Sequence, residues 1–354
     1  MEKIMCLSDR LGYRGGAERQ LSGLTYFLKQ EGYDVTAVTY LKQSHPSPLE
    51  LNYGMNYTCL DASNIISKLF KVGKYIKKNK IDVVIAYKNG PTMLCCLLKL
   101  LGLKFKLIAS ERSSTHEKNR ERLKFFLYRF SDVIVPNSYA QSRFIIIQYP
   151  NLAHKVKTIV NFVDVNKFSP NGSSRVSNCK GVIVGSIKEA KNPLNLIRAI
   201  KIMKDRNLVF HIDWIGTVND EGLYEKCVRL VDELEVSDYI CLKPATIDIH
   251  LEYLKYSFFC LPSIYEGFPN TLCEAMSCGL AVIASDVCDN PYILEQGKYG
   301  RLFNPNNPEM IADALSDMIR LSNNDLEELG LKNRSRIIEL CSSKSFVKNY
   351  MELI

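Results

Sequence analysis

Short apolar runs that alternate with segments of helix length are the feature of this sequence that most limits its fold. Five such runs occur in each half of the chain, and each is almost continuously apolar. They cover residues 3–8, 34–40, 81–87, 105–110 and 132–137, and then 181–187, 208–214, 239–242, 258–262 and 281–285. Continuous apolar runs are typical of strands covered on both faces, and their alternation with helices predicts parallel sheets with right-handed crossovers.

A segment rich in proline, glycine and serine interrupts this alternation near the midpoint. It reads SPNGSSR from Ser169 to Arg175 and has no apolar periodicity, which is typical of a linker. The chain has 354 residues, more than the roughly 250–300 at which a single core stops growing. We therefore expect an α/β protein with two doubly wound, Rossmann-like domains that face each other across a cleft. The first would span residues 1–170 and the second 171–354, with the last helix, 345–354, able to pack back on the first.

Composition excludes several classes of protein. The chain is 46% hydrophobic and 24% charged, as expected of packed domains rather than a disordered chain. The first residues carry an acid and too short an apolar run for a secretory signal, and three lysines interrupt the longest apolar stretch, residues 93–108. Twelve cysteines without a CxxC pair indicate reduced thiols rather than a zinc site. We expect a cytoplasmic protein, with peripheral attachment to the inner face of the cell membrane as an alternative.

Charge is distributed unevenly along the chain. Residues 1–170 hold 26 basic and 13 acidic side chains, a formal charge of +13, whereas the remainder carries −5. Such a basic half favours an anionic partner, and a solvated lysine-rich surface is the alternative. The stretches 63–80 and 119–130 combine cationic with apolar side chains and suit an anionic membrane surface, or they are ordinary helices packed on a sheet. No helix-turn-helix, RNP or OB pattern is present, so nucleic acid is not an expected partner.

The segment after the fourth apolar run of the second half carries the most chemical information. A loop that holds Glu266 leads into a helix expected to start near Pro269, with Asn270 or Thr271 as its cap. The N–H groups and dipole at such a helix start suit a phosphate or diphosphate. Glu266 and Glu274 flank this position and could accept hydroxyl hydrogen bonds from a nucleotide-sugar. Alternatively, one glutamate complements the helix dipole and the other is solvated.

These residues resemble a known family. The run EGFPNTLCEAMSCGLAVIAS, which begins at Glu266, is similar to the signature of glycosyltransferase family 4 (glycosyl transferases group 1), retaining enzymes with the GT-B fold. The resemblance extends over nearly the whole chain, through GGAERQL from Gly15 and VGSIKEAKNP from Val184. It implies a GT-B hexosyltransferase that retains the anomeric configuration of the sugar.

The resemblance also implies a role for each matching residue. Glu266 would contact donor-sugar hydroxyls, Glu274 would contact ribose hydroxyls, and Lys191 would neutralise the departing diphosphate. The remaining donor-binding positions are Gly15, Gly16, Ser186, Lys188, Gly267, Phe268, Pro269, Asn270, Thr271 and Leu272. No metal or other cofactor is expected, because a cation aimed at developing phosphate charge is itself useful catalysis.

Two positions depart from the family pattern. Ser186 stands where the family usually has an arginine that grips the diphosphate, and Lys188 is a candidate replacement. Arg112 stands where several members place a histidine near the reacting sugar, and we expect it to act as a catalytic charge clamp with Glu111 as its polar partner. His116 follows four residues later, where a surface role is the alternative.

These patterns lead to one predicted function and two alternatives. We predict transfer of a hexose or N-acetylhexosamine from a nucleoside diphosphate sugar, foremost a UDP-sugar, to a glycan or polyprenyl-linked acceptor. The donor would bind the second domain and the acceptor the basic first domain, in the biosynthesis of a surface polysaccharide such as capsule or lipopolysaccharide. The alternatives are a non-catalytic nucleotide-sugar-binding GT-B protein and another GT-B enzyme such as a nucleotide-sugar epimerase.

Overall fold

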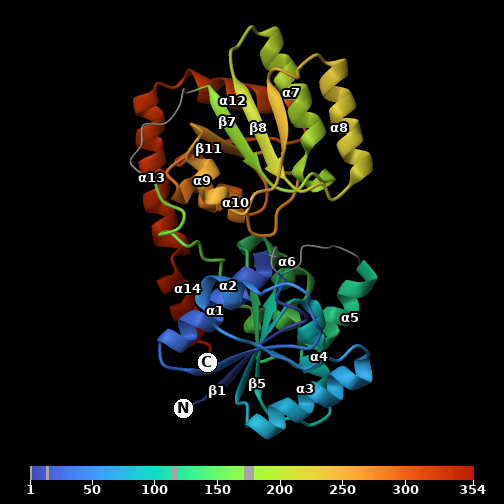
Figure 1. Cartoon of the computed structure of the whole chain (residues 1–354). Coiled ribbons are helices and arrows are strands. Elements are labelled where there is room, and N and C mark those ends of the chain that lie inside the picture. Colours follow the sequence, from blue (N-terminus) through green and yellow to red (C-terminus); the bar gives the residue numbers. More distant parts are fainter. Residues whose placement is uncertain (1, 13–15, 113–117, 171–178) are drawn as a thin grey trace. The chain divides into compact units, whose positions relative to one another are not determined.

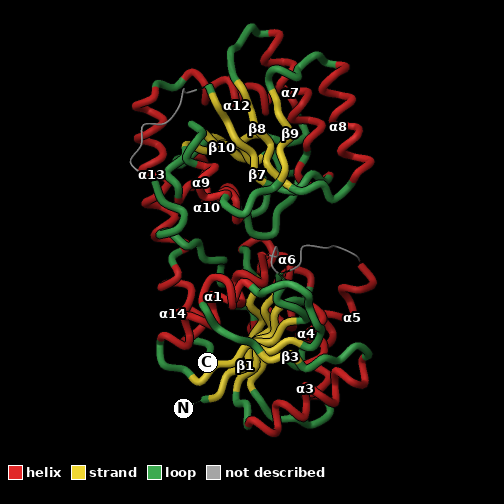
Figure 2. The backbone as a smooth tube through the Cα atoms, in the orientation of Figure 1, coloured by secondary structure: helices red, strands yellow, loops and turns green. Residues whose placement is uncertain are grey.

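The computed structural model describes residues 2–12, 16–112, 118–170 and 179–354 (Figure 1). The chain divides into two compact units. One consists of Met1–Phe162 with Ser343–Ile354, and the other of Val163–Ser342. Each unit holds one six-stranded sheet flanked by helices (Figure 2). The prediction of two doubly wound α/β domains is confirmed.

The sheet of the first unit is entirely parallel, in the order β3-β2-β1-β4-β5-β6. Its strands are β1 (Lys3–Ser8), β2 (Asp34–Thr39), β3 (Thr58–Cys59), β4 (Val83–Tyr87), β5 (Lys106–Glu111) and β6 (Val133–Pro136). The order reverses between β1 and β4, where Ile4 is in register with Val83. Sheets of this topology bind ligands at the carboxyl edge of such a switch point.

Helices cover both faces of this sheet, which explains the continuous apolar runs. They are α1 (Gly16–Gln30), α2 (Pro48–Tyr53), α3 (Ile65–Asn79), α4 (Asn89–Leu100), α5 (Lys118–Tyr128), α6 (Tyr139–Gln148), the 3-10 helix η1 (Pro150–Lys155) and α14 (Ser343–Met351). Met5 and Leu7 of β1 join the buried cluster under α3, α4 and α5, whereas Ile4 and Cys6 join the one under α1 and α14. Successive residues of a strand point to opposite faces, so each strand needs apolar side chains throughout. No helix among the described residues is both long and apolar enough to cross a lipid bilayer.

The sheet of the second unit has the same topology, in the order β12-β11-β10-β7-β8-β9 and again entirely parallel. Its strands are β7 (Lys180–Val184), β8 (His211–Gly216), β9 (Ile240–Pro244), β10 (Phe258–Leu261), β11 (Ala281–Ser285) and β12 (Arg301–Phe303). Its helices are η2 (Glu189–Lys191), α7 (Pro193–Asp205), α8 (Glu221–Glu233), α9 (Ile249–Tyr253), α10 (Asn270–Ser277), α11 (Asn290–Ile293), η3 (Glu295–Gly297), α12 (Pro308–Arg320) and α13 (Asn323–Cys341). Here the switch point lies between β7 and β10.

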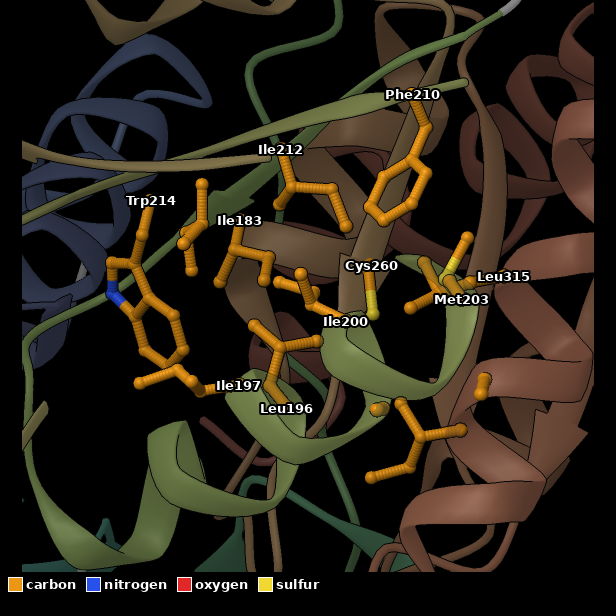
Figure 3. Close-up of a cluster of buried hydrophobic side chains, with 14 of the residues drawn as sticks. Ile183, Leu196, Ile197, Ile200, Met203, Phe210, Ile212, Trp214, Cys260 and Leu315 are labelled. Atoms are coloured by element: carbon orange, nitrogen blue, oxygen red, sulfur yellow. The ribbon is translucent and has the colours of Figure 1, made fainter. Parts of the chain in front are cut away.

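One face of this second sheet packs against α7 and α12 (Figure 3). Leu196, Ile200 and Met203 recur at helical spacing along α7 and are completely buried. They meet Ile212 and Trp214 of β8. The Trp214 indole donates a hydrogen bond of 2.8 Å to the Gly185 carbonyl, so the core also fixes the loop that follows β7.

The boundary between the units differs from the expected position at residue 170. Phe162 packs against Phe27 and Phe346 of the first unit, with ring centroids 5.1 Å away in each case. The Phe168 carbonyl, by contrast, accepts a hydrogen bond of 2.6 Å from Ser277 in the second unit. The chain therefore changes units directly after Phe162, because the aromatic side chains before and after that point pack in different cores. The final helix, α14, belongs to the first unit.

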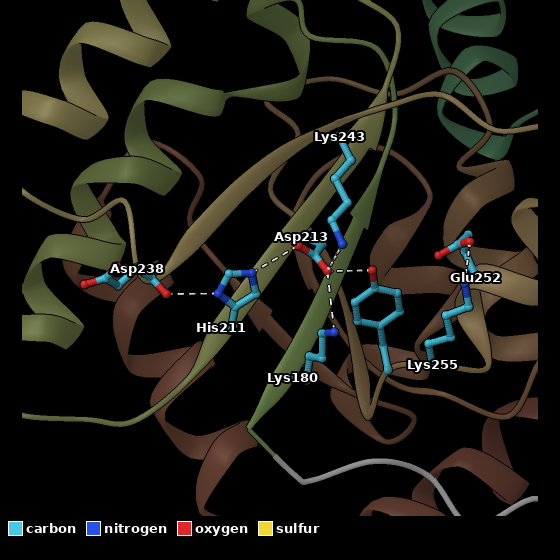
Figure 4. Close-up of polar contacts among 8 residues, drawn as sticks. Lys180, His211, Asp213, Asp238, Lys243, Glu252 and Lys255 are labelled. Atoms are coloured by element: carbon cyan, nitrogen blue, oxygen red, sulfur yellow. Dashed lines mark hydrogen bonds and ion pairs between the residues drawn. The ribbon is translucent and has the colours of Figure 1, made fainter.

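A buried carboxylate lies on β8, next to the core residue Trp214 in the sequence (Figure 4). Asp213 is 1% exposed and accepts hydrogen bonds from the Lys243 ammonium at 2.8 Å and the Tyr256 hydroxyl at 2.7 Å. His211 Nε2 lies 3.1 Å and Lys180 Nζ 3.8 Å from its oxygens. Burial by itself would raise the pKa of Asp213, but these hydrogen bonds and the nearby lysine charge outweigh it, so the pKa lies below its ordinary value of 3.8.

The Asp213→Asn substitution should lower the free energy of unfolding at pH 7 by about 2 kcal/mol, because it removes the carboxylate that several donors share. A lowered pKa stabilises the fold at pH values above the unfolded pKa, and this contribution is lost as pH falls through the folded pKa. Urea unfolding should therefore show a difference in unfolding free energy between wild type and variant at pH 7, and this difference should shrink as the pH is lowered below 3.8.

The matched control is Glu252→Gln. Glu252 forms an i,i+3 pair of 2.7 Å with Lys255, which is 59% exposed, and such a pair should contribute less than about 0.5 kcal/mol. An Asp213→Asn loss of equal size at both pH values would contradict the electrostatic account.

Candidate functional site

The loops after β7 and β10 are held together at the switch point of the second sheet. The Ile264 amide donates to the Ala190 carbonyl at 2.9 Å. The side chain of buried Asn192 donates to the carbonyls of Pro262 at 3.1 Å and Pro305 at 2.7 Å. Asn192 has φ 61° and ψ 43°, a left-handed conformation that asparagine adopts more readily than most residues. One side chain thus joins the loops that follow three different strands.

This arrangement brings together two residues predicted to be catalytic, Lys191 and Glu266. Lys191 Nζ lies 2.5 Å from Glu266 Oε1, and the Ser263 hydroxyl donates to the same oxygen at 2.6 Å. The side chains of Lys191 and Glu266 are only 13% and 10% exposed. Partial burial of this kind reduces solvent screening, so the ammonium and carboxylate act strongly on each other and on any charged group placed beside them.

Two glycines allow the β7 loop to lie this close to the sheet. A Cβ atom on Gly216 would lie 1.9 Å from the Gly185 carbonyl oxygen, a distance that no side chain tolerates. A Cβ on Gly185 would in turn lie 3.2 Å from Cε of Lys191. The lysine side chain therefore lies directly over the Gly185 backbone, and the Gly216 backbone lies against the other side of that loop.

The loop after β10 leads through Pro269 into the helix α10, which begins at Asn270. The expectation that Asn270 or Thr271 caps it is wrong, because Pro269 occupies the N-cap position and supplies no side-chain hydrogen bond. The Thr271 hydroxyl is buried and has no hydrogen-bond partner among the described residues. An uncapped first turn presents N–H donors and the positive end of the helix dipole, which suits an anionic group such as a phosphate.

The other donor residues predicted in the second half of the chain lie on the same two loops and on α10. Glu274 lies in the second turn of α10 and is 6% exposed, as is Phe268 at the end of the β10 loop. Leu272 is completely buried, and Gly267 and Ser186 are half-buried. Lys188 is exposed and forms no ion pair within the described part of the chain. Its predicted substitution for the family arginine remains a prediction.

Arg112 lies at the end of β5, where hydrogen bonds within the first unit occupy its guanidinium group. It donates to Ser110 at 2.8 Å, to the hydroxyls of Tyr87 at 3.0 Å and Tyr350 at 2.8 Å, and to Asn161. The guanidinium carbon also lies 4.5 Å from the Tyr87 ring centroid. These contacts tie α14 to the sheet, and the predicted role of Arg112 as a charge clamp remains a prediction.

Four further residues singled out in the sequence belong to the first half of the chain. Glu111 accepts a hydrogen bond of 2.9 Å from Tyr128 and pairs with Lys124 at 3.3 Å, so its ion pair is with α5. Gly16 is the first residue of α1. Gly15 and His116 lie outside the described residues.

A charged cluster that the sequence pattern did not predict lies at the switch point of the first sheet. Lys88 follows β4 and has φ 72° and ψ 170°, a conformation that is strained for a residue with a side chain. Its ammonium pairs with Asp9, which follows β1, at 3.1 Å and with Glu18 in the first turn of α1. Burial would raise the pKa of Asp9, but the charge of Lys88 and other hydrogen bonds lower it. The strand order of a doubly wound sheet was the signal that could have located this cluster.

Among the described residues, no three His, Cys, Asp or Glu side chains are grouped as metal ligands would be.

Two protein families match this chain, one in each half. Residues 14–167 match the Glycosyltransferase Family 4 domain, and residues 177–336 match the domain of Glycosyl transferases group 1. Together the two matches cover most of the chain, including the loops after β7 and β10.

Individual proteins show the same similarity. An uncharacterized glycosyltransferase of Haemophilus influenzae is 25% identical over 350 residues, which cover 96% of this chain and 95% of that protein. A Campylobacter jejuni N-acetylgalactosamine-N,N'-diacetylbacillosaminyl-diphospho-undecaprenol 4-alpha-N-acetylgalactosaminyltransferase is 26% identical, over 61% of this chain and 60% of that one. The structure of Anabaena HepE in complex with UDP and glucose superposes with a TM-score of 0.82 at 15% identity, over 100% of this chain and 99% of that one. These matches identify the fold as GT-B.

The Gly216→Ala substitution should lower the free energy of unfolding by about 2 kcal/mol or more, because its Cβ displaces the Gly185 backbone. The control is Gly222→Ala on α8, where the nearest atom to a new Cβ is 3.6 Å away. That variant should be neutral or more stable by up to about 1 kcal/mol. Urea unfolding measures both, and similar stabilities for the two variants would contradict the close approach at Gly216.

Proposed function

We propose that this chain, which belongs to glycosyltransferase family 4 (glycosyl transferases group 1), is a sugar transferase with a lipid-linked acceptor. It would transfer a hexose or N-acetylhexosamine from a UDP-sugar to a lipid-linked glycan. The chain is a glycosyltransferase of GT-B type. The observation that supports the proposed chemistry best is the Lys191–Glu266 pair at the switch point of the second sheet, where Glu266 lies on the loop that leads into α10.

The proposed donor site uses the groups that the second unit places at this edge. The diphosphate would bind the N–H groups at the start of α10 and the Lys191 ammonium. Both hydrogen bonds that Glu266 accepts from described residues go to Oε1, so its Oε2 would accept a sugar hydroxyl. Glu274 would accept the ribose hydroxyls from within α10. UDP is the preferred nucleotide because HepE was solved with UDP and with UDP-glucose.

The proposed reaction needs no metal ion. The bond between the anomeric carbon and the diphosphate oxygen breaks as the acceptor oxygen forms a new bond to that carbon, and the acceptor proton passes to the released diphosphate. Negative charge grows on the diphosphate during this step, and Lys191 lies where it would stabilise that charge. Transfer with retention of anomeric configuration is part of this proposal.

The acceptor is proposed to bind the first unit, in which residues 1–162 carry a formal charge of +13. Asp9, Glu18 and Lys88 at its switch point offer both donors and acceptors for sugar hydroxyls. The Campylobacter relative is named for an undecaprenyl diphosphate substrate. A lipid-linked acceptor would bring the enzyme to an anionic membrane surface and would place it in the biosynthesis of a surface polysaccharide such as capsule or lipopolysaccharide.

Thermal unfolding with a panel of UDP- and GDP-sugars tests the donor site. UDP-sugars should raise the melting temperature, because a ligand that binds only the folded state stabilises it. The Glu274→Gln substitution should weaken UDP-sugar affinity about tenfold through loss of a charged hydrogen-bond acceptor. Glu225→Gln, at an exposed position on α8, is the control and should match the wild type. Protection by GDP-sugars alone would contradict the choice of nucleotide, and unaltered affinity in Glu274→Gln would contradict the ribose contact.

Turnover measured in EDTA tests whether the reaction needs a metal ion, and turnover of a Lys191 variant tests the proposed role of that lysine. The wild type should remain active, and Lys191→Met should lower kcat by about 10²-fold or more because the leaving group loses its cation. Lys226→Met, at an exposed position on α8, is the control and should alter kcat less than threefold, about 0.6 kcal/mol. Lys188→Met should also lower kcat, because Lys188 is the predicted replacement for the family arginine, and an unaltered kcat in this variant would contradict that replacement. Donor binding without turnover, or loss of activity in EDTA, would contradict the proposed mechanism.

A further inference from the structure

Two helices of the first unit expose large apolar side chains side by side. Ile66 and Phe70, one helical turn apart on α3, are 76% and 68% exposed, and Leu101, which caps α4, is 67% exposed. We call this region, with the groove between the two helices, the α3–α4 surface. Scattered apolar residues are normal on a protein surface, but a contiguous patch of large ones indicates an interaction site.

A groove runs through this surface. It has a volume of about 730 Å³ and is lined by Ile66, Phe70 and Leu101 together with Leu69, Leu98 and Leu103. Gly73 also lines it, and an added Cβ there would meet Leu98 at 3.2 Å. Apolar side chains of α3, of the end of α4 and of Leu103 therefore make up most of the lining.

The rim of the groove is cationic. Lys74, Lys77 and Lys78 of α3 line it, and the Lys74 ammonium lies 5.9 Å from the Phe70 ring centroid. The helix α3 contains five lysines and no acid. The partner of this surface must therefore present both negative charge and apolar groups.

We propose that the α3–α4 surface docks on an anionic lipid bilayer. Ile66, Phe70 and Leu101 enter the boundary between headgroups and acyl chains, and the lysines meet the lipid phosphates. This proposal names the surface that would make the membrane contact of the proposed function. The biological purpose of docking rests on that function, but docking itself requires neither donor nor acceptor.

The rival stretch, 119–130, is less suited to this role because much of it faces the core. Phe125 is 2% exposed, and the Lys124 ammonium is buried against Glu111. Leu123 and Phe126 are the large apolar side chains of α5 that are exposed, and Arg129 covers the Phe126 ring at 4.4 Å.

A second copy of the chain is also a poor occupant. A twofold contact would place Lys74, Lys77 and Lys78 against their own counterparts, and like charges at close range repel.

Vesicle flotation with the full chain tests the proposal. Vesicles of phosphatidylcholine alone are compared with vesicles that also contain phosphatidylglycerol. The protein should float with the anionic vesicles, and Ile66→Ser/Phe70→Ser/Leu101→Ser should reduce binding at least tenfold. The matched control is Leu123→Ser/Phe126→Ser on α5, which should bind like the wild type. All five positions are exposed, so both variants should keep the wild-type melting temperature.

The charge contribution is tested by Lys77→Gln/Lys78→Gln. Each lysine removed should weaken binding to the anionic vesicles about fivefold. Loss of binding in the α5 control rather than in the α3–α4 variant would overturn the proposal, as would an absence of flotation with anionic vesicles. A dimer in gel filtration that the triple substitution dissociates would identify a second copy as the occupant and would also overturn it.

Hydrolysis of the UDP-sugar without vesicles should be the same in wild type and triple variant. Vesicle flotation therefore tests docking, and hydrolysis of the UDP-sugar tests the transferase assignment, so the failure of one is distinguished from the failure of the other.

Discussion

The proposed function of the second unit depends on the contact between the loops that follow β7 and β10. Lys191 and Glu266 are 75 residues apart in the sequence, and their contact exists only because β7 and β10 are neighbours at the switch point. The Asn192 side chain then joins the β7 loop to the Pro262 carbonyl after β10 and to the Pro305 carbonyl after β12. A carboxylate and an ammonium held in this way need little rearrangement to bind a charged ligand. Such preorganisation makes electrostatic stabilisation effective.

Much of the fold was predictable because its strands are covered on both faces. All ten expected strands are present, since burial on two sides imposes an uninterrupted apolar run. The two strands that were not expected, β3 and β12, lie at sheet edges and have two and three residues. Strands of two or three residues are too short to show an apolar run, whereas the longer edge strands β6 and β9 were predicted. The domain boundary was misplaced because the linker-like composition begins only at Ser169. Phe168, directly before it, already makes specific contacts with the second unit.

The candidate site shows a different limit of prediction. The positions of Lys191, Glu266 and Glu274 followed from a sequence resemblance, but the residues that hold them in place did not. Gly216 and Asn192 act through backbone proximity and carbonyl contacts, which leave no pattern in a single sequence. Arg112 shows the opposite case. Its type and position suggested chemistry, whereas its surroundings in the structure are two tyrosine hydroxyls and a serine that it holds together.

The excess of positive charge in the first unit has more than one physical role, and only the structure separates these roles. Lys124 neutralises a buried carboxylate, and Lys88 holds two acids at the switch point. Lysines of this kind are needed by the fold and are not available to an external anion. On α3, in contrast, Lys77 and Lys78 are exposed beside an apolar groove. Formal charge alone would assign all of them to one anionic partner. Burial shows instead that Lys124 of α5 points inward to a carboxylate, whereas Lys77 and Lys78 of α3 point outward beside exposed apolar side chains.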